Sequence, residues 1–288
     1  MPVLIYGVAN SAILAVWTIG FSLVFGIAGL ANFAYGAIYI LGSFLCWGLL
    51  TSLGLPFFLA IIISIVAMGA LGFAMYWGIL LRVRGLAISE LITTFAFGVA
   101  ILEFLRWKGF YGHEYSLPVF IEGSVNIGGV YIDYQRLFII GVGLALVLFL
   151  YFFTHHTRMG LSFRGIAQNE RTAISLGIES DWTAALSLGL GSALAAVAAV
   201  ATISLGLINI NQGYEVLLWV IAVGILGGLE SVEGIIAAAF VLGFAQTATA
   251  MFFNPMWMVV VPVAAIILIL AVKPSGIFGK FKELEERV

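Results

Sequence analysis

The first 81 residues of this chain contain no aspartate, glutamate, lysine or arginine. A water-soluble core of that length would be surrounded by charged residues, because these side chains are almost never fully buried. Over all 288 residues the hydrophobic fraction is 63%, the charged fraction is 9% and the mean hydropathy is +1.17. Soluble domains have a very different balance. We therefore expect an integral membrane protein whose surface faces lipid over much of its area.

Long apolar stretches predict where the chain crosses the membrane. A helix needs about 20 apolar residues to span the hydrocarbon core of a bilayer. By this criterion the spans are residues 3–27, 33–51, 56–81, 86–105, 136–154, 182–207, the shorter stretch 216–229, 235–252 and 256–272. The expected fold class is an all-α polytopic bundle of about 8–9 transmembrane or broken helices, with residues 1–288 forming a single transmembrane domain.

Lysine and arginine predict the orientation, because cytoplasmic loops retain positive charge. Nine of the 12 basic residues lie on one side of this arrangement, namely Arg82, Arg84, Arg158, Arg164, Arg171, Lys273, Lys280, Lys282 and Arg287. That side should be cytoplasmic, with the loop 155–181 and the tail 273–288. The N-terminus and the loop 106–135 should face outside. In that loop Gly128 and Gly129 separate two short apolar runs, which predicts a hairpin; it could be an ordinary connection or a docking surface for an external partner.

Two glycine clusters have matching spacing. Gly29 ends the run 26–29 and is separated by six residues from Gly36, and Gly227 ends the run 224–227 and is separated by six residues from Gly234. Both clusters interrupt a hydrophobic stretch, and irregular backbone at membrane depth is tolerated only where protein or a water-filled cavity satisfies its polar groups. Broken helices at corresponding positions of two halves point to a transport path. We expect a two-fold internal repeat; the competing explanation is close helix packing through small residues.

Residues at these interruptions and in the span 86–105 are the candidates for lining a translocation pathway. They are Asn32, Phe33, Tyr35 and Gly36 at the first, Glu230 and Ser231 at the second, and Thr93 and Thr94 within the span 86–105. Asn32 could meet the solute, bond unwound backbone or cap the second span. The threonines could simply bond the carbonyl of the preceding turn, and a carboxylate at the cytoplasmic face could be solvated. For Glu90, near Arg82 and Arg84, an interfacial ion pair is the simplest expectation.

The polar stretch 158–181 is the most informative loop. Ile166, Ala173 and Ile174 are spaced by seven and eight residues, which places them on one face of a short helix. Gly177 is expected to end that helix. A short amphipathic helix held between two spans could rest on lipid headgroups or insert into a groove on a soluble partner. The mixed charge and modest apolar face favour the partner.

Several classes of function are excluded or disfavoured by what the sequence lacks. It contains no phosphate-binding loop of the type found in ATPases, so this chain is not itself the ATPase. We find no hydrolase or metalloprotease motif, and we expect neither a catalytic nor a metal site. The net charge of −2, with basic residues scattered over short loops, argues against a nucleic-acid partner.

Five short motifs together resemble the branched-chain amino-acid ABC importer permeases, specifically the shorter of their two permease subunits. The motifs are residues 29–36 (GLANFAYG), 91–94 (LITT), 164–170 (RGIAQNE) with Ala173 and 176–178 (LGI), 226–231 (LGGLES) with Gly234, and 273–279 (KPSGIFG). The resemblance covers nearly the whole chain. It departs at Tyr35, where the family commonly has histidine, at Ala37, where an acidic residue often follows the glycine, and at Glu233, which replaces a frequent proline.

The resemblance implies a function and a set of partners. Residues 164–178 would be the coupling helix that sits in a cleft of a cytoplasmic ATPase, with the contact made by Arg164, Ala167, Glu170, Arg171, Ala173 and Gly177. The partners would be a second permease subunit, two ATP-binding subunits, an extracytoplasmic solute-binding protein and the bilayer. ATP and magnesium would be bound by the ATPases. The chain would carry branched-chain or other hydrophobic amino acids across the cell membrane by alternating access.

The alternative is an ion-coupled secondary transporter or a channel for a small neutral solute. That class normally places an ionisable residue deep in the membrane, and the deep polar residues here are almost all neutral. An assembly subunit without transport activity would leave the two interrupted helices unexplained.

Overall fold

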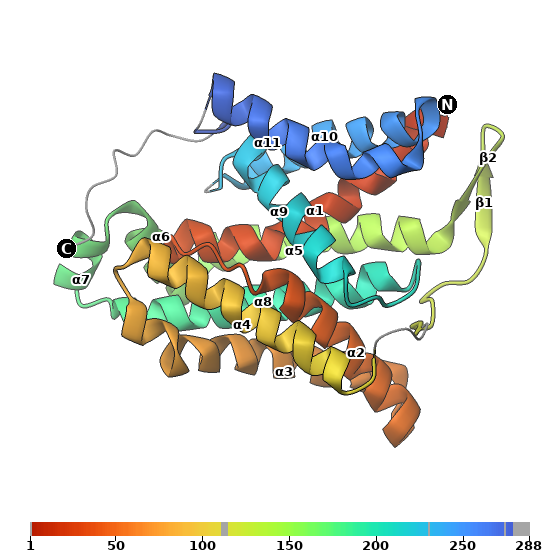
Figure 1. Ribbon diagram of the computed structural model, residues 1–288. Coiled ribbons are helices and arrows are strands. Elements are labelled where there is room, and N and C mark those ends of the chain that lie inside the picture. Colours follow the sequence, from red (N-terminus) through yellow and green to blue (C-terminus); the bar gives the residue numbers. More distant parts are fainter. Residues whose placement is uncertain (1, 111–114, 230, 274, 279–288) are drawn as a thin grey trace.

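The computed structural model of the chain is almost entirely helical (Figure 1) and describes residues 2–110, 115–229, 231–273 and 275–278. Its elements in chain order are α1 (Pro2–Ala28), α2 (Tyr35–Leu53), α3 (Phe57–Gly78), η1 (Leu80–Val83), α4 (Ala87–Trp107), β1 (Ser124–Ile127), β2 (Val130–Asp133), α5 (Tyr134–His156), α6 (Arg158–Gln168), α7 (Glu170–Ser175), α8 (Ser180–Ile203), α9 (Gln212–Gly227), α10 (Val232–Phe252), η2 (Pro255–Val259) and α11 (Val260–Val272).

Eight helical segments in the described part of the chain are long and apolar enough to cross a membrane. They are α1, α2, α3 with η1, α4, α5, α8, α10 and η2 with α11. The short ninth stretch is α9, an apolar helix of 16 residues that begins at Gln212 rather than at the expected 216. The predicted polytopic all-α fold, with eight or nine helices depending on this short one, is therefore confirmed.

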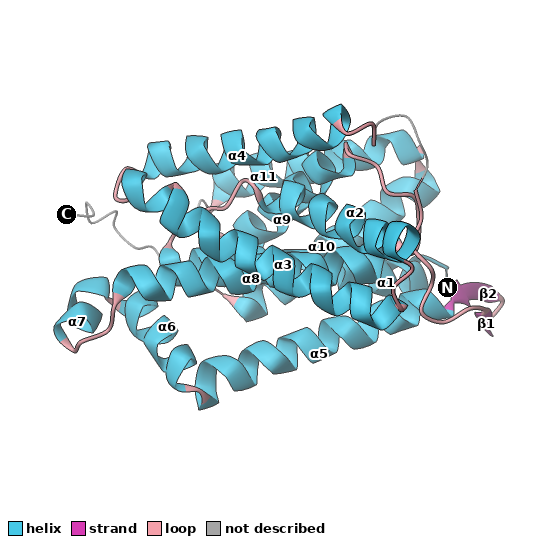
Figure 2. Cartoon of the chain, turned by 90° about the horizontal axis from the view of Figure 1, so that it is seen from below, coloured by secondary structure: helices cyan, strands magenta, loops and turns pink. Residues whose placement is uncertain are grey.

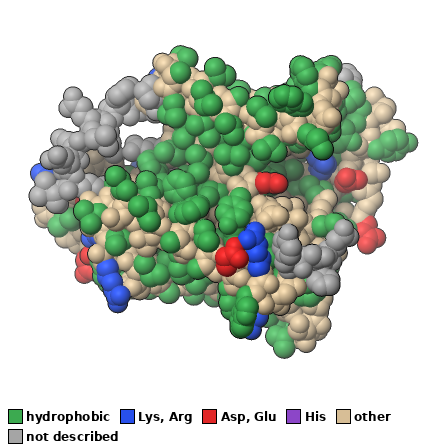
Figure 3. All heavy atoms as spheres, viewed as in Figure 1, with side chains coloured by type: hydrophobic (Ala, Val, Ile, Leu, Met, Phe, Trp, Pro, Cys, Tyr) green, Lys and Arg blue, Asp and Glu red, His purple; other side chains and the backbone are tan. Residues whose placement is uncertain are grey.

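Helix α8 lies at the centre of the bundle and α11 at its edge. In the 18-residue apolar stretch of each span, 78% of the residues are buried for α8 but only 6% for η2 with α11. Small side chains make the central position possible, since Ala195, Ala196, Ala198 and Ala199 are all fully buried and allow neighbouring helices to approach closely. Hydrophobic side chains cover much of the outer face in Figure 3, as lipid contact requires.

Both predicted interruptions are present as helix breaks. The first break, residues 29–34, follows α1, and its Gly29 has a φ of +59°. The second break lies between α9 and α10 and starts at Gly228 with a φ of +94°. The corresponding glycines have different neighbours, because Gly36 packs on Gly213 of α9 whereas Gly234 packs on Gly227. The two-fold repeat stays a prediction.

The second break is closed by the C-terminal strap, residues 275–278. Ile277 N donates to Leu226 O at 2.8 Å, and Phe278 N donates to Gly227 O at 3.2 Å. The last carbonyls of a helix have no partner within the helix, so the strap satisfies two of those at the end of α9. Gly276, with a φ of +80°, lies so close that a Cβ there would be 2.5 Å from Ile225 O. The predicted motif 273–279 thus contains a cap for α9, although Pro274 and Gly279 lie outside the described residues.

On the opposite end of the bundle, β1 and β2 form the predicted hairpin (Figure 1). Gly128 and Gly129 both have positive φ, at +59° and +84°, which suits a tight two-residue turn. The loop before the hairpin is fastened by the buried Gln135, whose Oε1 accepts from Phe120 N and whose Nε2 donates to Ala201 O, each at 2.9 Å.

We predict that Gly36→Leu destabilises the fold. A Cβ at Gly36 would lie 1.9 Å from Gly213 O, so α2 and α9 must separate. The free energy of unfolding should fall by about 1–3 kcal/mol or more, the usual cost of overpacking. Thermal unfolding of the purified protein measures it. Gly48→Leu is the control in the same helix, because nothing lies within 4 Å of its Cβ; equal melting temperatures for the two variants would contradict the prediction.

We also predict that Gly276→Ala detaches the strap. The added Cβ would meet backbone atoms of α9, so the amides of Ile277 and Phe278 should lose their acceptors and exchange with deuterium faster. Gly109→Ala serves as the control, since Gly109 has a similar φ of +85° with nothing within 4 Å and reports the strain of the left-handed backbone alone. Unchanged exchange of these amides in Gly276→Ala would show that the strap does not depend on this close approach.

Candidate functional site

The first break is organised around Asn32, which is completely buried. Its Oδ1 accepts a hydrogen bond from Ala34 N at 3.1 Å, and its backbone carbonyl accepts from Tyr35 N at 3.1 Å. Within the described residues its Nδ2 has no partner. A buried donor left unpaired costs about 1–3 kcal/mol, so the amide bonds the unwound backbone and still has N–H groups available for an acceptor.

Thr94 holds the first break against α4. Its Oγ1 accepts a hydrogen bond from Phe33 N at 3.2 Å and donates to Leu91 O, in the preceding turn, at 3.0 Å. One turn further, Gly98 brings α4 so close to the break that a Cβ there would lie 3.1 Å from Ala34 Cα. Thr94 is fully buried, whereas Thr93 is partly exposed. Of the two threonines, Thr94 is therefore the one that the structure brings to the break.

Tyr35 points into the core. Its hydroxyl donates to Trp17 O at 2.7 Å, and its ring packs edge-on against Phe21. The neighbouring Thr202 completes a bonded cluster, because its Oγ1 lies 3.0 Å from Trp17 Nε1 and donates to Ala198 O at 2.7 Å. In this conformation Tyr35 and Gly36 fasten the helices around the break, while Asn32, Phe33 and Thr94 lie together at it.

A narrow apolar pocket adjoins the first break between α2, α4 and α9. Its lining includes Phe33, Ala37, Phe95, Gly98, Val99 and Leu217. The pocket thus places aliphatic and aromatic side chains beside the polar backbone of the break. At about 10 Å³ the pocket has room for no more than about one water molecule, so an aliphatic solute group would fit only if the surrounding helices moved apart.

At the second break, Ser231 caps α10 by accepting a hydrogen bond from Gly234 N at 3.0 Å. The break is tied to α1 by Ser22, whose hydroxyl donates to Leu229 O at 2.9 Å. Glu230, the other pathway candidate here, lies outside the described residues. The pathway role of both residues stays a prediction.

The loop between α5 and α8 forms two helices, α6 and α7, so the prediction of a single short helix over this stretch is wrong. The chain is extended at Asn169, with φ −158° and ψ +107°, and the Asn169 side chain accepts from Thr172 N at 2.9 Å to start α7. Asparagine favours such caps because its side chain competes with the helical backbone. As a result Ile166 and Ala173 are buried but Ile174 is 50% exposed. Gly177 ends α7 as predicted, with a φ of +85°.

The candidate coupling residues fall into exposed and shielded groups. Arg171 and Gly177 are exposed, Ala173 is buried, and Arg164, Ala167 and Glu170 are half-buried. Two hydrophobic residues at this end of α7 are exposed: Ile174, which was expected on the apolar face, and Leu176, which is 77% exposed. The sequence signal that could have predicted this exposure is the occurrence of isolated apolar residues in a polar loop. Together they give α7 a mixed cationic and apolar surface.

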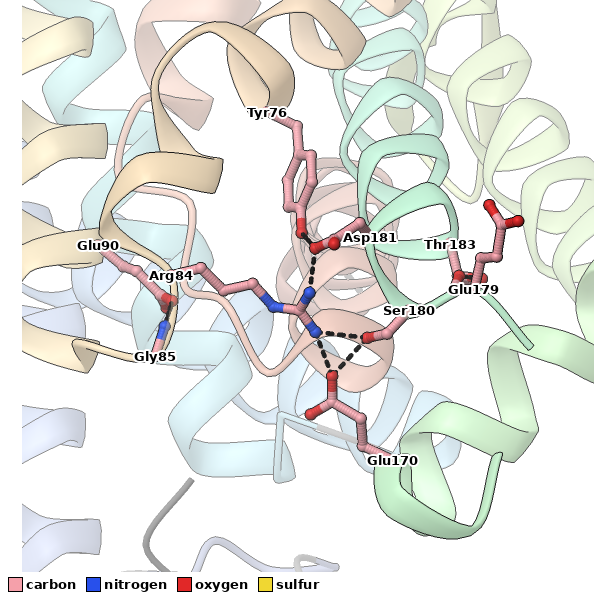
Figure 4. A network of polar contacts seen from close by, with 9 residues as sticks. All are labelled: Tyr76, Arg84, Gly85, Glu90, Glu170, Glu179, Ser180, Asp181 and Thr183. Carbon is pink, nitrogen blue, oxygen red and sulfur yellow. Dashed lines mark hydrogen bonds and ion pairs between the residues drawn. The ribbon is translucent and has the colours of Figure 1, made fainter. Parts of the chain in front are cut away.

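The polar network behind α7 was not predicted (Figure 4). Arg84, between η1 and α4, forms ion pairs with Glu170 of α7 and Asp181 of α8 and donates to Ser180 Oγ at 2.7 Å. Tyr76 of α3 donates its hydroxyl to Asp181 at 2.7 Å. Glu90, for which an ion pair was expected, accepts from Gly85 N at 2.9 Å, while Arg84 pairs with the two other carboxylates.

Arg84 keeps its charge in this network. Partial burial would lower the pKa of the guanidinium, but Tyr76, Asp181 and Glu170 raise it, and the net direction is upward. Glu170, Ser180 and Asp181 lie 86 to 97 positions after Arg84 in the sequence, which is why no local motif predicted the network.

Comparison with known proteins agrees with this architecture. A sequence model of the family described as "Branched-chain amino acid transport system / permease component" matches residues 3–270. The high-affinity branched-chain amino acid transport system permease protein BraD of Pseudomonas aeruginosa is 29% identical, over 96% of this chain and 95% of BraD. LivH of Escherichia coli K12, a permease protein with the same description, is 28% identical, over 95% of this chain and 94% of LivH.

Among solved structures, PsaBC from Streptococcus pneumoniae in complex with Fab has a similar fold. The TM-score is 0.52 at 14% sequence identity, covering 96% of this chain and 94% of the other. At that identity the likeness concerns the fold alone. Since the family match extends over nearly the whole chain and the described residues contain eight candidate spans, this protein belongs to the permease components of branched-chain amino acid transport systems and is a multi-pass membrane subunit of an ABC transporter.

Proposed function

We propose that this chain carries branched-chain or other hydrophobic amino acids into the cell as the permease subunit of an ABC importer. The observation that supports the solute class best is the first break, where Asn32 has an unpaired amide N–H and the next residue, Phe33, lines a small apolar pocket. An amino acid of this class needs a hydrogen-bond donor for its carboxylate and an apolar wall for its side chain. The names of BraD and LivH support the same solute class.

The first break is the proposed place where the solute passes. Its backbone is held by Thr94 from α4 and by the Asn32 side chain, and neither contact is part of a continuous helix. These side-chain hydrogen bonds can break and re-form one at a time when helices move. The hydrogen bonds inside a helix form and break cooperatively. Alternating access requires two conformations whose populations a partner can shift. We assign the hinge between them to this break.

The partner assignments follow from the two ends of the bundle. The α6–α7 end carries the larger share of the basic residues, so we place it in the cytoplasm, where α7 would dock on one of two ATPase subunits that bind ATP and magnesium. The β1–β2 hairpin lies at the opposite end (Figure 2), where a solute-binding protein would deliver its cargo. A second permease subunit would complete the membrane part.

We predict that Asn32→Leu and Asn32→Asp both reduce uptake of labelled leucine by at least about tenfold in proteoliposomes that contain the complete importer. Neither variant retains the amide N–H, and a loss of about 1.4 kcal/mol of binding free energy corresponds to a tenfold change in affinity. Asp keeps an oxygen that can accept from Ala34 N, whereas Leu removes it. Melting temperatures identify variants that fail through folding. Normal uptake by a stably folded Asn32→Asp importer would remove Asn32 from the transport path.

We further predict that Arg171→Glu combined with Ile174→Asp weakens copurification of the ATPase subunits and lowers uptake with it. Both side chains are exposed on α7, so the substitutions should leave the permease folded. Arg158→Glu is the matched control, an exposed arginine at the start of α6. If the control and the α7 variant retain the ATPases equally well, docking does not use this surface.

A further inference from the structure

Arg84 joins three elements on the proposed cytoplasmic side. Its guanidinium spans the gap from the η1–α4 connection to Glu170 on α7 and to Ser180 and Asp181 at the start of α8 (Figure 4). Ser180 also donates its hydroxyl to Glu170. One cation thus holds two carboxylates that would otherwise repel each other, and each is bonded to a further hydroxyl.

The network is partly exposed, but it contains several charges. The side chains of Arg84, Glu170 and Asp181 are 34%, 38% and 39% exposed. Isolated exposed ion pairs contribute little, whereas a forked guanidinium within a network of several charges is the geometry that does contribute. Glu170 is the first residue of α7, directly next to the exposed surface assigned to ATPase docking. A movement of α7 that displaces Glu170 would therefore change its ion pair with Arg84.

Gly85, the residue after Arg84, connects this loop to α4. Gly85 N donates to Glu90 Oε1 at 2.9 Å, and Glu90 is only 4% exposed in the first turn of α4. The φ of Gly85 is +85°, a conformation that L side chains rarely adopt. The sharp turn brings the loop that carries Arg84 onto the first turn of α4. The loop that carries Arg84 is thus hydrogen-bonded to the first turn of α4 through Gly85 and Glu90.

Helix α4 then reaches the first break within about one turn. Thr94 follows Glu90 by four residues, a rise of about 6 Å along a helix, and accepts the hydrogen bond from Phe33 N. A short helix segment thus carries the Arg84 connection at its start and the support of the break one turn later. No other element needs to move between the two.

We propose that Arg84 is a positioning residue that links displacement of α7 to the first break through Glu90 and Thr94. This inference rests on the proposed function, because it assigns to α7 the contact with the ATPase. In it, ATP-driven movement of α7 shifts the start of α4, and Thr94 then moves or releases the backbone at Phe33. The rival explanation is a purely structural fastening of the cytoplasmic loops.

The test measures solute moved per ATP hydrolysed in proteoliposomes with the complete importer, for Arg84→Gln, Thr94→Val and the double variant. We expect each single variant to lower the ratio at least threefold while ATP hydrolysis and copurification of the ATPases persist. Arg84 and Thr94 do not contact each other, so a structural fastening predicts additive losses. A single linked route predicts that the double variant is no worse than the more severe single one.

Arg82→Gln is the matched control, because Arg82 lies two residues away in η1, and it should keep the wild-type ratio. Arg84→Lys retains the charge but not the fork and should fall between wild type and Arg84→Gln; it also serves if Arg84→Gln fails to fold. An unchanged ratio in Arg84→Gln, or additive losses in the double variant, would overturn the inference. Failure of the wild-type importer to move any branched-chain amino acid would instead overturn the proposed function.

Discussion

The structure depends on one constraint: inside a bilayer every backbone N–H and C=O must find a partner within the protein. Among the described residues, eight candidate spans and the shorter α9 meet this requirement by themselves over most of their length. The two breaks do not, and much of the distinctive chemistry of the chain gathers there. Asn32 and Thr94 serve the first break, and Ser22, Ser231 and the C-terminal strap serve the second. The polar residues of the membrane interior are thus explained first by the backbone they satisfy.

The two breaks are satisfied in different ways. The strap lies across the end of α9 and makes backbone hydrogen bonds to it, whereas the first break depends on side chains of a residue within it and of a neighbouring helix. Asn32 also retains an unpaired N–H that nothing in the described part of the chain satisfies. This asymmetry is why we assign transport to the first break and a supporting role to the second.

Sequence patterns predicted the spans, the hairpin at Gly128 and Gly129 and the stop at Gly177, because each depends on local hydrophobicity or on glycine conformation. They failed at Asn169, where a side-chain cap divided one expected helix into two. They could not reveal the Arg84 network, since its partners lie 86 and 97 positions away. Tyr35 and Asn32 were equal candidates in sequence, and only packing showed that the first is bonded within the core.

The C-terminal strap has a consequence for biosynthesis. Residues 275–278 follow α11, so α9 and α10 are made, and begin to enter the membrane, before the amides of Ile277 and Phe278 exist. Until then the carbonyls of Leu226 and Gly227 lack the partners they have in the finished protein. The second break is therefore completed only after the last helix has been synthesised. A chain interrupted before this point would leave the carbonyls of Leu226 and Gly227 without the partners that the strap provides.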